Sequence, residues 1–136
     1  MKHKLLIGIA FLALSSPAFA GPREDILALL ASEASVADSS FSGFSVKDGD
    51  AFFHATSTTG KPNTPSCTTC HTSSPKNVGE TRAGKSIDPM AVSLSPNRFT
   101  DQAKIDKWFR RNCNSVLGRE CTALEKGNYI TYLSSQ

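Results

Sequence analysis

The stretch Cys67-Thr68-Thr69-Cys70-His71 decides what this chain folds around. Two cysteines lie three positions apart and a histidine follows directly, which is the attachment pattern for a c-type haem. Each thiol can form a thioether with one haem vinyl group, and the neighbouring imidazole can bind the iron from one side. We therefore predict that Cys67 and Cys70 hold haem c and that His71 is the proximal ligand.

The first twenty residues predict a secretory signal peptide. Lys2 and Lys4 give a positive start, and residues 5–14 form an apolar run that is too short to span a bilayer. Ala18-Phe19-Ala20 is a small-x-small cleavage site. We expect cleavage after Ala20 and a periplasmic location, where disulfides are chemically permissible.

The charge pattern excludes several function classes. The formal charge of the 136-residue chain is +3, and it falls to +1 when Lys2 and Lys4 are removed. The sequence has no basic run and no basic stripe interleaved with aromatic residues, so we expect no nucleic acid partner. No apolar stretch after the signal is long enough to cross a bilayer, so we expect no membrane insertion of the mature chain.

Apolar spacing and capping residues predict an all-α fold. We expect helices over 23–35, over 45–55, from 101 to about 111 with Thr100 as its cap, and from Thr122 to near the end. The chain between 72 and 99 is rich in glycine and proline, and a loop of this length can wrap a haem. The expected organisation is a signal peptide over 1–20, an N-terminal helical extension over 21–44 and a haem domain over 45–136.

Two other interpretations of the motif cysteines have less support from the sequence than haem attachment. A zinc site would need Cys113 and Cys121 as its second half, but their separation of eight positions does not match structural zinc spacing. A thioredoxin-type redox pair needs a βαβ context, and the sequence predicts no strands. If Cys67 and Cys70 hold haem, Cys113 and Cys121 remain and can pair with each other.

The sixth ligand of the iron decides the function, and the residues leave it open. Met90 follows a proline in the wrapping loop, and a thioether is a common ligand. Asn112 is placed at the end of the third helix, immediately before Cys113, where a disulfide to Cys121 would hold its backbone. His54 is better explained as a solvated or propionate-linked histidine. The last alternative is an iron without a second protein ligand.

Several further segments resemble one family, the sphaeroides haem protein (SHP) group of class I cytochromes c. The similar segments are Gly49-Asp50-Ala51-Phe52-Phe53, Pro65 to Thr72, Asn97-Arg98-Phe99-Thr100-Asp101, Asn112-Cys113, Leu117 to Cys121, Glu125-Lys126 and Tyr132-Leu133. They extend from Ser45 to Leu133. The asparagine-cysteine pair with a second cysteine nearby is the specific part, because the haem motif alone indicates only a cytochrome c.

The resemblance implies a class I cytochrome c fold with helices packed around one covalent haem. It also implies that Asn112 is a labile sixth ligand, which detaches on reduction and leaves the iron open to oxygen or nitric oxide. It further implies a disulfide between Cys113 and Cys121 and electron exchange with a di-haem cytochrome c partner. Met90 remains a competing ligand in this sequence.

Three hypotheses follow. The first is a periplasmic monohaem cytochrome that transfers electrons and binds a diatomic ligand after Asn112 leaves. The second is an ordinary electron carrier ligated by His71 and Met90. The third is a non-haem metal-binding module. Enzymatic turnover stays open, because the sequence supplies no acid or base near the iron.

Overall fold

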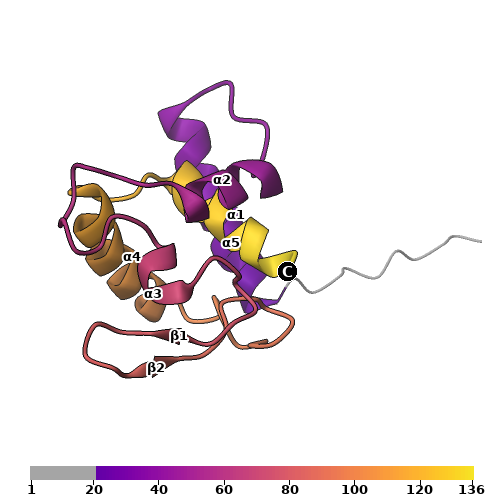
Figure 1. Ribbon diagram of the computed structural model, residues 1–136. Helices are drawn as coiled ribbons and strands as arrows, with labels where there is room; N and C mark the ends of the chain where they lie inside the picture. The colour runs from indigo at the N-terminus through magenta and orange to yellow at the C-terminus, as the bar shows by residue number, and fades with distance from the viewer. Residues whose placement is uncertain (1–20) are drawn as a thin grey trace, which may run out of the picture.

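The computed structural model describes residues 21–136, so the expected signal peptide lies outside the described residues. The described chain forms helices and one short hairpin (Figure 1). The elements in chain order are α1 (Pro22–Ala37), α2 (Val46–His54), α3 (Thr68–His71), β1 (Gly79–Glu80), β2 (Ser86–Ile87), α4 (Gln102–Leu117) and α5 (Ala123–Ser134). The expected all-α class is confirmed.

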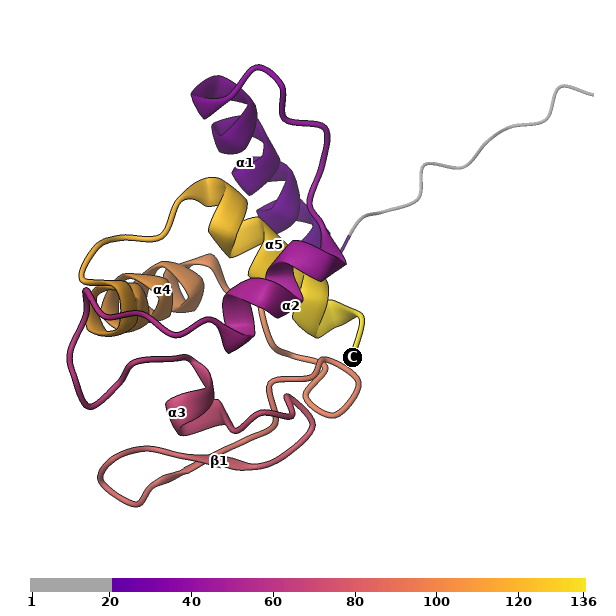
Figure 2. The ribbon, with the colours of Figure 1, turned by 45° about the horizontal axis from the view of Figure 1, so that its top comes forward.

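Helices α2 and α5 cross at Gly49, near the centre of the molecule in both views (Figures 1 and 2). A Cβ on Gly49 would lie 2.0 Å from the carbonyl oxygen of Asn128 and 2.6 Å from the Cβ of Tyr132. Glycine is therefore required for the two backbones to approach. Gly127, the glycine of α5, has a different neighbour: a Cβ there would meet the ring of Phe44.

Side chains cap α2 and α5 as their sequences predict. The Ser45 side chain accepts a hydrogen bond from the backbone N–H of Asp48 at the start of α2. Thr122 and Glu125 form a complete capping box at the start of α5. The Glu125 carboxylate also accepts two hydrogen bonds from the Arg119 guanidinium, so the loop before α5 is fixed to the helix it precedes.

Helix α1 belongs to the same core as the later helices. It buries Ile26, Leu30 and Ala34 and packs along α5 (Figure 2). The Arg23 side chain donates hydrogen bonds to the carbonyl oxygens of Pro96 and Arg98, in the loop before α4. Residues 21–44 thus precede the expected haem domain in the sequence, but they pack into the same core as its helices.

Helix α4 differs from its prediction at both ends. Its N-cap is Asp101, whose side chain accepts from the backbone N–H of Lys104, and not Thr100. The helix continues beyond residue 111 to Leu117 and ends at Gly118, which has a left-handed φ of 68°. Asn112 therefore lies inside the helix and does not terminate it. The extension buries Cys113 and Val116, and this burial outweighs the weak helix propensity of the intervening polar residues.

The chain between α3 and α4 is mostly irregular, as expected, but it contains one unexpected sheet. Strands β1 and β2 pair antiparallel over two residues each, with Gly79 opposite Ile87. The rest of this segment is tied to other parts of the chain by backbone hydrogen bonds. The N–H of Ala91 donates to the carbonyl of Pro75, and the N–H of Val92 donates to the carbonyl of Leu133.

The core lies between α1, α2, α4 and α5 and is centred on Phe53, Ile130 and Leu133, which are fully buried. The spacing of Trp108 from Ile105 and Phe109 favours the apolar face of α4, but its side chain is 49% exposed. The buried stripe of α4 passes through Ile105 and Phe109, and Trp108 lies beside it. None of the helices between residues 21 and 136 has the length and apolar character that a bilayer crossing requires.

Candidate haem site

The haem motif forms the one-turn helix α3. The N–H groups of Cys70 and His71 both donate to the carbonyl of Cys67, so the turn brings the two thiols and the imidazole together. Cys67 is half-buried and packs against the main core, while Cys70 is half-buried beside it. Both thiols are free, as attachment of a haem requires.

Burial keeps the ligating groups of the motif uncharged. It lowers the pKa of His71 to about 4, with a smaller contribution from the positive charge of Arg98. The imidazole is therefore neutral at pH 7, and neutral imidazole is the form that binds a metal. Burial also raises the pKa of the Cys67 thiol to about 11, which disfavours the thiolate that a zinc site would need.

His71 carries an unsatisfied polar atom. Its Nδ1 is buried and has no hydrogen-bond partner within residues 21–136. A buried imidazole nitrogen without a partner is costly unless another group occupies the site. Two free thiols beside a neutral, unpartnered imidazole are the donor set that haem c uses, so the residues present fit this cofactor.

The backbone around α3 is held in unusual positions. Thr72, directly after His71, has a φ of 62°, which is uncommon for a residue with a Cβ, and its hydroxyl donates to the carbonyl of Ser74. Gly79 of β1 lies so close that a Cβ would be 2.2 Å from the carbonyl oxygen of Cys70. The hairpin thus supports α3 from one side (Figures 1 and 2).

Cys113 on α4 and Cys121 in the loop before α5 form a disulfide, with their Cα atoms 5.6 Å apart. Both residues are buried. The pairing removes these sulfurs from any four-cysteine zinc site, so the non-haem metal hypothesis loses half of its ligands. The bridge fixes the C-terminal part of α4 to the loop before α5.

Asn112 lies on α4 directly before the disulfide. Its side chain is exposed and makes no hydrogen bond to any residue between 21 and 136, so its amide is available to a ligand site. Asn114, two positions further along the same helix, differs because its amide donates to the carbonyl of Arg110.

The other two ligand candidates are already engaged in contacts. Met90 is buried, with 6% of its surface exposed, and belongs to the main core cluster. This burial matches the alternative that it fills space in the core. His54 has its Nε2 2.8 Å from the carbonyl oxygen of Ser73 and its Nδ1 3.0 Å from oxygens of Asp50. Both ring nitrogens therefore have oxygen partners within the protein.

One residue near the motif, Tyr129, was missed as a contributor to the site. Tyr129 is buried beside Cys67 and Arg98, and burial is the main reason that its pKa is raised. Arg98 donates to the carbonyl of Pro89 and so holds the loop that carries Met90. Rings from α2, α4 and the intervening loop surround Tyr129; they are Phe52, Phe53, Phe99 and Phe109. The only sequence signal was an aromatic residue on the last helix.

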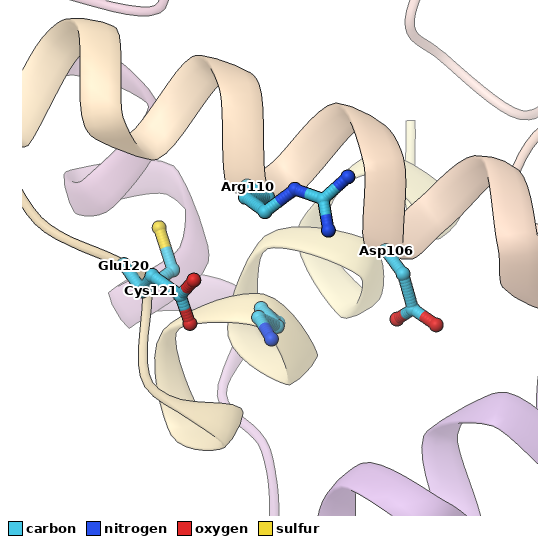
Figure 3. Close-up of a pocket in the computed structure, with 5 residues that line it drawn as sticks. Asp106, Arg110, Glu120 and Cys121 are labelled. Carbon is cyan, nitrogen blue, oxygen red and sulfur yellow. The ribbon is translucent and has the colours of Figure 1, made fainter.

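A charged pocket of about 190 Å³ lies elsewhere, between α4 and α5 (Figure 3). Asp106 and Arg110 of α4 line it together with Glu120, Cys121 and Lys126. It contains no residue of the haem motif. We therefore place the candidate site at α3 and not at this pocket.

A helical fold that presents two free thiols and an adjacent neutral histidine is typical of a c-type cytochrome. Residues 39–133 match the family described as a domain of unknown function, DUF1924. The cytochrome c-type protein SHP of Cereibacter sphaeroides is 53% identical over 88 residues, which cover 65% of this chain and 68% of that protein. Cytochrome c'' of Methylophilus methylotrophus is 39% identical over 68% of this chain and 65% of its own length.

Solved structures agree with the sequence matches. Oxidized SHP, described as an oxygen-binding cytochrome c, superimposes with a TM-score of 0.77 and 43% identity, covering 84% of this chain and 96% of its own. Oxidized cytochrome c'' from Methylophilus methylotrophus gives a TM-score of 0.70 and 33% identity, covering 85% and 94%. The chain belongs to the DUF1924 family and is an SHP-like class I cytochrome c. It is therefore a monohaem cytochrome, and the family and fold expected from the motifs are confirmed.

Proposed function

We propose that this cytochrome is an exported electron carrier whose second axial ligand, Asn112, is released on reduction. Cys67 and Cys70 would anchor one haem covalently and His71 would bind its iron. The observation that carries the proposal is the state of Asn112, an exposed and unbonded amide directly before the Cys113–Cys121 disulfide. One-electron redox change and binding of diatomic molecules are chemistry that a haem supplies when bound.

The protein's own residues would set how firmly each side of the iron is held. His71 is half-buried, neutral and carried on a turn that β1 supports, so it would be a permanent ligand. Asn112 would bind through an amide oxygen, which is a harder and weaker donor to ferrous iron than a thioether or imidazole. Loss of this contact on reduction would cost little, because an amide oxygen that leaves the iron can form hydrogen bonds with water.

The disulfide would keep this release local. It fixes the backbone on both sides of the turn at Gly118, so Asn112 can move its side chain without unwinding α4. Met90 would remain in the core, since its removal from there would expose buried apolar surface. This burial supports Asn112 over Met90 as the ligand.

The relatives support a role in binding a small molecule. One solved relative is described as an oxygen-binding cytochrome c, and we extend that property to this chain, with nitric oxide as a second diatomic ligand. Exchange of electrons with a redox protein of the di-haem cytochrome c type would reset the oxidation state. Export with cleavage after Ala20 would place this exchange in the periplasm. Enzymatic turnover forms no part of the proposal.

Absorption spectra of the holoprotein test this function. We expect a low-spin ferric form without the red-edge charge-transfer band of methionine–iron bonding, and a ferrous form that binds carbon monoxide rapidly. Slow or absent binding of carbon monoxide, together with the methionine band, would refute the asparagine ligand and leave an ordinary carrier ligated by Met90. A Met90→Leu variant with an unchanged spectrum would independently support Asn112.

A further inference from the structure

The loop before the haem motif is hydrogen-bonded to the end of α4 (Figure 2). This loop comprises residues 56–66. The backbone N–H of Lys61 donates to the carbonyl oxygen of Ser115 at a distance of 2.7 Å. The Thr59 hydroxyl donates to the carbonyl oxygen of Leu117, also at 2.7 Å. The last four carbonyl groups of a helix have no partner within it, so the loop satisfies two of these groups in α4.

Thr64 is the buried part of this contact, with 8% of its surface exposed. Its hydroxyl oxygen lies 2.9 Å from the Ser115 hydroxyl and 3.2 Å from the Ser115 carbonyl oxygen. The backbone N–H of Thr64 donates to the carbonyl of Lys61, so the same residue closes a turn of the loop. Opening such a buried contact leaves polar groups unsatisfied, which is costly. We call the contact between Thr64 and Ser115 the Thr64 clamp.

Two glycines allow the loop and the helix to come this close. A Cβ on Gly60 would lie 2.2 Å from the carbonyl oxygen of Val116, and a Cβ on Gly118 would lie 2.3 Å from the carbonyl oxygen of Thr59. Each obstacle is a backbone atom, so a larger residue would separate the loop from the helix. The loop and the end of α4 therefore form one packed unit.

The clamp connects the two sides of the candidate haem site. Thr64 lies three positions before Cys67, and the buried Ser66 between them accepts hydrogen bonds from the first residue of α3. Ser115 lies three positions after Asn112, so these two residues share a face of α4. A short path through one side-chain contact therefore joins the haem attachment site to the proposed sixth ligand.

We propose that Thr64 is a positioning residue for the sixth ligand, because it holds α4 at a fixed place relative to Cys67. The clamp restricts the positions that α4 can take, so less conformational freedom is lost when Asn112 binds the iron. Without the Thr64 hydroxyl, α4 has more freedom to lose, and the ferric protein holds its sixth ligand less firmly. This inference rests on the proposed function of Asn112.

Substitutions of Thr64 in the holoprotein test the proposal. Thr64→Val removes the hydroxyl but keeps the backbone N–H and nearly the same volume, whereas Thr64→Ser keeps the hydroxyl. The control is Thr100→Val, which removes a hydroxyl bonded to the carbonyl oxygen of Asn97, just before the other end of α4. The measurement is an azide titration of the ferric protein, followed by absorption. Azide must displace the sixth ligand, so its affinity reports how firmly that ligand is held.

We expect Thr64→Val to bind azide about three- to tenfold more tightly than the wild type, the range that loss of one hydrogen bond permits. Thr64→Ser and Thr100→Val should each differ from the wild type by less than about twofold. The rate of carbon monoxide binding to the ferrous protein should stay the same in all variants, because Asn112 has then already left the iron. Equal azide affinity in Thr64→Val and the wild type would overturn the positioning role.

A second variant keeps the test decisive if Thr64→Val fails to fold. Ser115→Ala removes one of the two acceptors of the Thr64 hydroxyl and leaves the carbonyl oxygen in place. It should tighten azide binding in the same direction as Thr64→Val, by a smaller factor, and more than Thr100→Val does. Azide affinities that are equal in Ser115→Ala and Thr100→Val would overturn the proposal in that case.

The Asn112→Ala background separates failure of this inference from failure of the proposed function. Asn112→Ala alone should bind azide more tightly than any Thr64 variant, and adding Thr64→Val should produce no further gain. A further gain in the double variant would overturn Thr64 as a positioning residue but leave Asn112 supported as the ligand. If Asn112→Ala binds azide as the wild type does, Asn112 is not the ligand, and the proposed function and this inference both fail.

Discussion

Replacing Gly49 with alanine should destabilise the protein, although alanine is the better helix former. In an unobstructed helix the change would stabilise by about 1 kcal/mol. Here the new methyl group would lie 2.0 Å from the carbonyl oxygen of Asn128 and 2.6 Å from the Cβ of Tyr132. Neither atom can move away without separating α2 from α5. Overpacking of this kind costs about 3 kcal/mol, so we expect a net loss of roughly 2 kcal/mol.

A matched substitution isolates the cause. The methyl group of Gly127→Ala would lie 2.1 Å from a ring atom of Phe44, but that ring is the mobile end of a half-buried side chain and can turn aside. We expect Gly127→Ala to stay within about 1 kcal/mol of the wild type. Urea unfolding of the two holoproteins, followed by circular dichroism, measures both. Equal stabilities for Gly49→Ala and Gly127→Ala would refute the argument that backbone contact at Gly49 fixes the crossing.

Three further predictions concern the disulfide, a histidine and the first helix. Replacing both Cys113 and Cys121 with alanine should lower the free energy of unfolding in urea by about 2–3 kcal/mol, since the bridge closes a short loop. An unchanged free energy of unfolding would mean that the disulfide does not stabilise the fold. The hydrogen bond from His54 to the Ser73 carbonyl is the largest cause that raises the pKa of His54. The stabilisation that protonated His54 gains from this hydrogen bond is present below pH ~6.5 and is lost as the pH rises through the raised pKa. The free energy of unfolding should therefore decrease over this range of pH, and His54→Gln should abolish the decrease. Arg23→Ala should lose about 1–2 kcal/mol and speed amide exchange in α1 more than in α5; equal exchange in both helices would contradict this anchoring role.

Local signals in the sequence were sufficient for most of the helices. Thr122 and Glu125 predict the start of α5 because a capping box satisfies backbone N–H groups within four residues. The same holds for Ser45 at α2. The haem motif could also be recognised from the sequence, since haem attachment requires both thiols and the imidazole on one turn of the chain.

The end of α4 could not be predicted in this way. Polar residues with weak helix propensity follow Arg111, and they suggested an early stop. The helix continues because burial of Cys113 and Val116 and the bridge to Cys121 stabilise it, and these contacts involve residues distant in sequence. Glycine at position 118 is typical of a turn, but only its left-handed backbone shows that it is the end of the helix.

The burial of three residues could not be predicted from the sequence for a similar reason; they are Trp108, Met90 and Asn112. Apolar spacing alone favours Trp108 in the core, yet the buried face of α4 consists of Ile105, Phe109, Cys113 and Val116. Met90 and Asn112 competed as ligands on chemical grounds alone. Their environments now differ, one buried in the core and the other exposed and unbonded, and only long-range packing could make that distinction.

The ferric absorption spectrum of Asn112→Ala tests the central claim most directly. Asn114→Ala is its control, because Asn114 lies on the same helix and bonds only to the carbonyl of Arg110 within residues 21–136. We predict that Asn112→Ala retains covalent haem but becomes high-spin in the ferric form, while Asn114→Ala keeps the low-spin spectrum of the wild type. A low-spin, wild-type spectrum in Asn112→Ala would contradict Asn112 as the sixth ligand and the proposed release on reduction.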